Sequence, residues 1–126
     1  MNFTLPKTYD NKLSIREWHN RKTNSVKQGE HRDILQWLQQ WFSSQCDGGW
    51  EHSYVIIIDT LDNPGWCVRI DLCGTELEGK TFDRIENLDI DDDWMVCEVK
   101  DRKFIGAGDP SKLVKILQVF RAWVEN

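Results

Sequence analysis

A turn between two apolar segments constrains the fold of this chain more than any other feature of its sequence. The run Asp62-Asn63-Pro64-Gly65 combines a proline, which fixes φ, with a glycine, which accepts positive φ. The preceding segment, His52–Thr60, contains the continuous β-branched run Val55–Ile58, which is typical of a buried strand. The following segment, Trp66–Leu72, alternates apolar and polar residues. The sequence therefore predicts a β-hairpin made of these two segments.

Amphipathic patterns predict a helix on each side of the strand region. After Asp33, apolar residues recur every three or four positions up to Phe42, and the glycines after Cys46 end this pattern. Near the other end, Asp109 is a suitable N-cap, Pro110 suits the first helical position, and an apolar face follows. Three more strands are expected at Lys80–Ile85, Trp94–Lys100 and Phe104–Ala107, with an acidic loop at Asp89–Asp93.

The order of these elements predicts an α+β fold. A helix, an antiparallel meander of four or five strands and a second helix form a two-layer domain if both helices pack on one face of the sheet. Sequential strands should then mostly lie next to each other.

Charge divides the chain into two parts. Residues 1–32 carry seven Lys or Arg against three Asp or Glu, whereas residues 33–126 carry nine against eighteen. We therefore expect residues 1–32 to be a basic, partly ordered N-terminal extension and residues 33–126 to be an acidic domain. The extension could pack on the domain, or it could dock onto nucleic acid or a toxin.

Composition narrows the functional class. With 126 residues and 40% apolar content, the chain can bury one sizeable core. It has no signal-peptide pattern and no run of eighteen apolar residues, so we expect a cytoplasmic protein that does not contact the membrane. Its four cysteines lack the close spacing of zinc sites and are expected to be free thiols. No cofactor or metal is expected.

Several longer strings of residues lie within the predicted elements and between them. They are Trp37–Phe42, Gln45–Gly48, Trp50-Glu51-His52, Thr60–Trp66, Ile70-Asp71-Leu72, Thr75, Trp94 and Leu113–Trp123. Together they resemble the immunity protein 53 family over about residues 33–124. This chain departs from the family pattern at Gly49, where the family favours an acidic residue, and its residues 1–32 lie outside the resemblance.

The resemblance implies a role in bacterial polymorphic toxin systems, in which a cell makes a small protein that binds and neutralises its own toxin. Eight residues are candidates for binding this partner: Asp47, Trp50, Glu51, His52, Asp62, Asn63, Trp66 and Asp71. Aromatic anchors supply affinity, and acidic groups attract a basic partner. An alternative interpretation places both tryptophans in the core and gives the polar residues local turn contacts.

Stoichiometric binding to a toxin domain, without catalysis and without a nucleic-acid partner, is the predicted function, and a monomer is the favoured state. A nuclease toxin is an expectation from the acidity of the domain, because an acidic inhibitor can occupy the place of phosphates. Two alternatives remain open. One is a small-ligand or carbohydrate module that uses exposed tryptophans. The other is a small hydrolase that uses His52 with nearby carboxylates.

Overall fold

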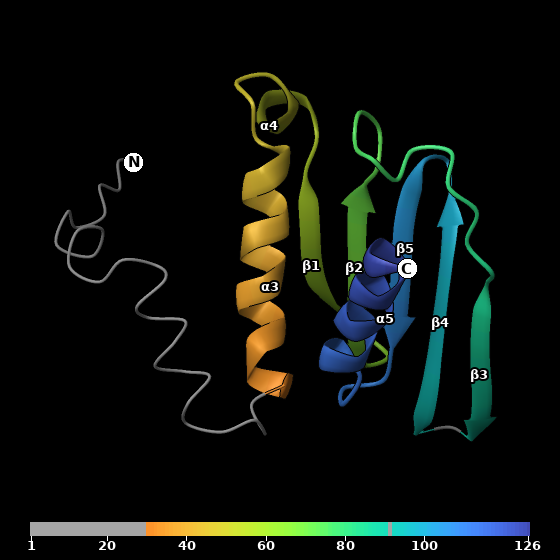
Figure 1. Cartoon of the computed structure of the whole chain (residues 1–126). Helices are drawn as coiled ribbons and strands as arrows, with labels where there is room; N and C mark the ends of the chain where they lie inside the picture. The colour runs from red at the N-terminus through yellow and green to blue at the C-terminus, as the bar shows by residue number, and fades with distance from the viewer. Residues whose placement is uncertain (1–29, 91) are drawn as a thin grey trace, which may run out of the picture. The chain divides into compact units, whose positions relative to one another are not determined.

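The structure, a computed structural model of the chain, describes residues 30–90 and 92–126 (Figure 1). Residues 1–29, which form most of the expected N-terminal extension, lie outside this part. The elements are α3 (Glu30–Gln45), α4 (Trp50–Ser53), β1 (Ile56–Leu61), β2 (Gly65–Asp71), β3 (Ile85–Ile90), β4 (Asp93–Lys100), β5 (Lys103–Gly108) and α5 (Leu113–Glu125). None of the described helices has the length and apolar composition needed to cross a bilayer.

The five strands form one antiparallel sheet in the order β1-β2-β5-β4-β3. The predicted α+β class, with a helix before and a helix after the sheet, is confirmed. The order departs from a simple meander at one step, because β2 pairs with β5 and not with β3. The chain leaves β2 at one end of the sheet and passes β5 and β4 before it enters β3 at the far edge (Figure 1).

One face of the sheet and both long helices share a single core. The three central strands contribute alternate side chains, since residues two apart share a face. The buried cluster is made of Ile34, Leu38, Trp41, Val68, Ile70, Leu72, Leu77, Met95, Cys97, Phe104, Ile116, Leu117, Phe120 and Trp123. The ring centroids of Trp41 on α3 and Phe120 on α5 lie 5.1 Å apart in an edge-to-face arrangement. Each large apolar side chain buried in this way contributes about 1.5–3 kcal/mol to stability.

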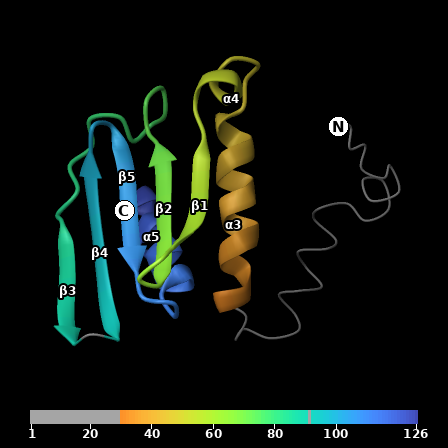
Figure 2. The ribbon, with the colours of Figure 1, turned by 180° about the vertical axis from the view of Figure 1, so that it is seen from behind.

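Close approach between α5 and the sheet depends on Gly106 in β5. A Cβ atom at this position would lie 2.4 Å from Cγ2 of Ile116, well inside van der Waals contact. Glycine therefore lets α5 settle directly on the centre of the sheet. Figure 2, which shows the molecule from behind, places α5 across β2 and β5 on the far side of the sheet.

Two of the predicted strands begin in the wrong place. The first was expected from His52, but His52 lies in α4 and β1 begins at Ile56. The third was expected at Lys80–Ile85, but β3 spans Ile85–Ile90. The segment before β3 is held by α5 and not by a strand: Lys80 Nζ donates to the Trp123 carbonyl at 2.7 Å, and Trp123 Nε1 donates to the Thr81 carbonyl at 2.8 Å.

Other boundaries also differ from the prediction. The acidic segment expected as a loop, Asp89–Asp93, is largely strand, because β3 continues to Ile90 and β4 begins at Asp93. The helix before the sheet already begins at Glu30 and not at Asp33. The last helix begins at Leu113, and Asp109 is not its N-cap. The four cysteines are free thiols, as predicted.

Candidate partner-binding surface

The eight candidate residues fall into two groups at opposite ends of the β1–β2 hairpin. One group lies around α4 and the start of β1, and the other lies at the turn between β1 and β2. The six residues of β1 separate the groups by about 17 Å, at a rise of about 3.4 Å per residue. The structure therefore does not bring the candidates into one cluster, and their role in binding stays a prediction.

In the first group, Asp47 and Glu51 fix the backbone of α4. Asp47 Oδ1 accepts hydrogen bonds from the N–H groups of Gly49 and Trp50, both at 2.9 Å. The Glu51 carboxylate in return accepts from the N–H groups of Asp47 and Gly48, both at 2.9 Å. The N–H groups of Trp50 and Gly49 lower the pKa of Asp47, and backbone N–H groups likewise lower the pKa of Glu51. Both side chains stabilise a local turn and keep this end of the hairpin negative.

Trp50 is an internal residue. Its side chain is only 6% exposed, and its indole N–H donates to the Cys73 carbonyl at 2.8 Å. The rings of Trp41, Phe42 and Tyr54 surround it, with centroids 5.9 to 6.3 Å away. Trp50 therefore attaches α4 to the core and does not offer an exposed anchor.

Asp71 at the end of β2 holds the beginning of β1. Its Oδ2 accepts from the Val55 N–H at 2.9 Å, and its Oδ1 lies 3.4 Å from Lys103 Nζ. His52, which lies in α4 before the start of β1, is exposed. A pocket of about 360 Å³ lies beside Asp71, lined by Tyr54, Asp71, Cys73, Asp101, Arg102 and Lys103. His52 does not line this pocket, so the geometry does not combine it with Asp71 as a hydrolase would require.

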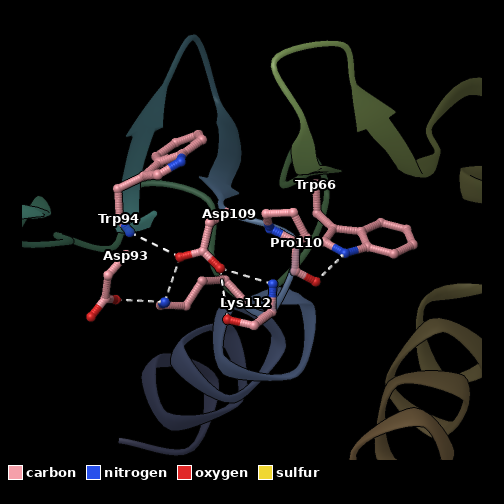
Figure 3. A network of polar contacts seen from close by, with 7 residues as sticks. Trp66, Asp93, Trp94, Asp109, Pro110 and Lys112 are labelled. Atoms are coloured by element: carbon pink, nitrogen blue, oxygen red, sulfur yellow. Dashed lines mark hydrogen bonds and ion pairs between the residues drawn. The ribbon is translucent and has the colours of Figure 1, made fainter. Parts of the chain in front are cut away.

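The second group lies at the hairpin turn. Asp62 and Asn63 are exposed, and the Asn63–Pro64 peptide bond is cis. Trp66 is half-buried, and its Nε1 donates to the Pro110 carbonyl at 2.9 Å (Figure 3). Trp66 thereby ties the start of β2 to the loop that leads into α5.

A charged network lies next to Trp66 and connects β4 to α5 (Figure 3). Asp109 is buried. Its Oδ2 accepts hydrogen bonds from the Trp94 N–H at 2.9 Å and from Lys112 Nζ at 2.5 Å. Its Oδ1 accepts from the N–H and the hydroxyl of Ser111. Lys112 also pairs with Asp93 at 2.7 Å. The Lys112 ammonium and the Ser111 hydroxyl hold the pKa of Asp109 well below its usual range. The network anchors the loop before α5, which explains why the helix begins three residues later than expected.

Sequence reasoning missed a group of exposed apolar side chains among the described residues. Seven large hydrophobic side chains are exposed there, and five of them belong to α3 or to the segment that contains β1. These five, which we call the α3–β1 surface, are Leu35, Phe42, Val55, Ile57 and Ile58. In both views α3 lies beside β1, on the side away from β2 (Figures 1 and 2).

The prediction that β1 is a buried strand is wrong. Four of its six residues are exposed, because β1 is the outermost strand of the sheet and has a neighbour on one side only. β-branched residues suit a pleated strand whether it is central or at an edge. The run Val55–Ile58 therefore predicts a strand but does not indicate whether that strand is buried. The observation that could have pointed to an edge strand is its place as the first strand of a terminal hairpin.

The stretch of sequence that contributes the α3–β1 surface is acidic. Residues 33–68 contain five Asp or Glu and no Lys or Arg. Asp59 on β1 pairs with Arg69 on β2 at 3.2 Å, and the other four carboxylates of this stretch form no ion pair with another described residue. An apolar surface with an acidic surround suits a partner that is apolar at its centre and basic at its rim.

Two observations bear on the other functional classes. Six of the seven tryptophans are described, and each of them is buried or half-buried, so a carbohydrate platform of exposed indoles is not formed by these six. Within residues 30–90 and 92–126, no three His, Cys, Asp or Glu side chains are grouped so that they could hold a metal ion.

Comparison with known proteins identifies the family. Searches of curated proteins and of solved structures found no match to this chain. A family model described as Immunity protein 53 matches residues 35–125, which include every described strand, α4, α5 and most of α3. This chain therefore belongs to the immunity protein 53 family.

Proposed function

We propose that this immunity protein neutralises a cognate toxin domain by binding it stoichiometrically, without turnover and without a cofactor. The observation that carries the proposal is the α3–β1 surface. Its five apolar side chains are exposed on α3 and on the segment that contains β1, and exposed apolar groups of this size often mark a binding site. In a member of an immunity family, the partner that needs such a surface is a toxin.

The charge of the surface points to a basic partner. Residues 33–68, which cover most of α3 and all of β1, contain no Lys or Arg to repel cations. Such a field accelerates association with a positively charged protein and disfavours wrong partners. Toxins that cleave nucleic acid carry basic substrate grooves, and we propose this class for the cognate toxin.

The predicted site residues fit this proposal in two ways. His52, Asp62 and Asn63 are exposed at the two ends of β1, where they extend the contact as a polar rim. The buried or bonded candidates act indirectly: Asp47, Glu51 and Trp50 position α4, and Asp71 positions the start of β1. We further propose that the protein acts as a monomer in the bacterial cytoplasm, with residues 1–32 as an extension of the 33–126 domain.

Co-expression tests the proposal directly. A bacterial host that carries the toxin domain encoded beside this gene should grow when the immunity protein is produced and should stop growing when it is not. The two purified proteins should form a one-to-one complex, with a dissociation constant of about 1 nM or below. Full toxicity in the presence of the folded immunity protein would refute the proposed function.

A further inference from the structure

The backbone of β1 has hydrogen-bonding groups that point away from the sheet. In an antiparallel pair, residues with both groups directed at the neighbour alternate with residues whose groups point outward. The Asp71 N–H donates to the Val55 carbonyl at 3.1 Å, so Val55 is an inward residue. From the register Ile57↔Arg69 and Asp59↔Cys67, the next inward residues are Ile57 and Asp59. The N–H and C=O groups of Ile56, Ile58 and Thr60 therefore point outward.

The rest of the sheet gives the same result independently. The Leu72 N–H donates to the Arg102 carbonyl at 3.0 Å, and the Asp109 N–H donates to the Trp94 carbonyl at 3.1 Å. Residues that bond to one neighbouring strand alternate with residues that bond to the other. From these bonds and the registers, the N–H and C=O groups of Arg69 again point towards β1. Among residues 30–90 and 92–126, no strand takes up the outward groups of β1.

The sequence of β1 lacks the features that prevent strands from adding to an edge. Natural sheets protect their edges with Lys, Pro, bulges or unpaired inward charges, or cover them with a helix or loop. α3 lies beside β1 (Figures 1 and 2), yet four of the six β1 residues are exposed. The β1 sequence contains only one charged residue, Asp59, whose carboxylate is already paired with Arg69, and its register with β2 is regular throughout. Ile57 and Ile58 project to opposite faces of the sheet and are both exposed, so apolar side chains are offered on each face of a sixth strand.

Charge decides between the possible occupants of the edge. A second copy of this chain would bring residues 33–68, with five carboxylates and no Lys or Arg, against an identical acidic segment. Like charges across an interface cost free energy and slow association. A strand from a basic protein would meet complementary charge at both ends of β1, at Asp47 and Glu51 near its start and at Asp62 after its end.

We propose that the toxin places an extended segment, flanked by Lys or Arg, along the outer edge of β1 as a sixth antiparallel or parallel strand. Main-chain bonds to Ile56, Ile58 and Thr60 supply register, and the α3–β1 surface supplies apolar contact. This inference rests on the proposed function and specifies the surface through which it operates.

A pair of matched proline variants tests it. Ile58→Pro removes an outward N–H, which no described strand uses, and Glu86→Pro makes the same change on β3, whose residue 86 is outward by the same count. Both are made in the full-length chain and measured with the toxin domain encoded beside the gene. We expect Ile58→Pro to weaken binding at least tenfold, because the toxin loses a bond and meets the proline ring. Glu86→Pro should bind like the wild type.

Amide hydrogen exchange of the wild-type chain gives a readout that needs no variant to fold. The toxin should slow exchange at Ile58 and Thr60, while Ile57 and Asp59 should be slow already in the free protein. If the wild type neutralises the toxin but these two amides are unaffected, or Ile58→Pro binds normally, strand addition is refuted and the proposed function stands. Slow exchange in a dimer of the free chain would assign the edge to a second copy and overturn the inference. Failure of the wild type to neutralise the toxin would overturn both.

Discussion

The two outer strands of the sheet, β1 and β3, meet solvent in opposite ways. β1 is regular and carries exposed Ile57 and Ile58 beside one surface ion pair, between Asp59 and Arg69. β3 shifts register against β4 between Asn87 and Ile90, and its Glu86 pairs with Arg84, which also contacts Glu98 at 3.2 Å. The sequence of β3 continues into the most acidic stretch of the chain. The β3 edge therefore carries charge and an irregular ladder, whereas the β1 edge has a regular ladder and exposed apolar side chains.

The difference indicates which edge of a small sheet can accept an additional strand. Both strands have an unpaired side among the described residues, so free backbone groups alone do not distinguish them. What distinguishes them is the presence of obstacles on β3 and their absence on β1. The flanks also differ in anchoring, because the Asp109 network fixes β4 to the loop before α5, whereas β1 relies on β2 and on Asp71.

The largest effect is expected from a proline one residue away from the edge position. Ile57→Pro removes an N–H that bonds to β2, so the free energy of unfolding should fall by about 3 kcal/mol. Ile58→Pro should lower it by about 1 kcal/mol or less, since its N–H has no partner in the sheet. Urea denaturation of both variants measures this contrast. Equal losses would mean that the alternation assigned to β1 is wrong.

Acid should destabilise the protein by weakening the Asp109 network between β4 and the loop before α5. Asp109 has a lowered pKa when folded, so it stabilises the protein above the ordinary Asp pKa of 3.8, and this contribution is lost as pH falls below that value. Asp109→Asn should reduce the melting temperature by about 5 °C or more at pH 7, and the gap to the wild type should narrow below about pH 4. Thermal melts across this range test the sign. A gap that stays constant with pH would exclude the charge of Asp109 as its cause.

Side-chain charge should separate the two edges in binding. Ile57→Lys puts a cation on the α3–β1 surface, and we expect toxin affinity to fall about tenfold because a basic partner is repelled and apolar contact is lost. Leu88→Lys makes a comparable change on exposed β3 and should leave affinity unchanged. Titration calorimetry with the two variants gives both values. Equal weakening by both would place the partner across the whole sheet.

The smallest effect is expected when the charge of Glu86 is removed from the β3 edge. Glu86→Val removes the charge that pairs with Arg84, and β3 should then self-associate weakly at high protein concentration. Sedimentation analysis of Glu86→Val beside Glu86→Gln separates the loss of charge from the gain of an apolar side chain. A monomeric Glu86→Val would show that the register shift alone is sufficient to protect β3.

Sequence patterns predicted the class of the fold because they report local periodicity. The two long amphipathic helices and the hairpin around Asn63-Pro64 were visible as such, and the resemblance to the immunity family is confirmed by the match over residues 35–125. The pairing of β2 with β5 was not visible, since it depends on contacts between residues more than thirty positions apart. Capping chemistry was also misread. Asp47 accepts from the backbone at the start of the short helix α4, which contains His52, where the first strand was expected to begin. Asp109 bonds to Lys112 where a helix start was expected.

The site was harder to predict than the fold for a related reason. Tryptophan and aspartate were taken as binding groups by type, but Trp50 is buried and Asp71 holds a backbone N–H. The exposed isoleucines were taken as core by type. Residue type cannot report which strand lies at the edge of the sheet, and that position decides what a partner can touch.

The contact between Gly106 and Ile116 has a consequence for how such a protein can change over generations. Because no side chain fits between α5 and the sheet at this point, the centre of the molecule tolerates little variation. Positions 57 and 58, which lie two strands away from that contact and are open to water, can exchange residues without disturbing it. Related proteins could therefore adapt to a changing toxin by substitutions in the edge strand while the packed centre stays the same.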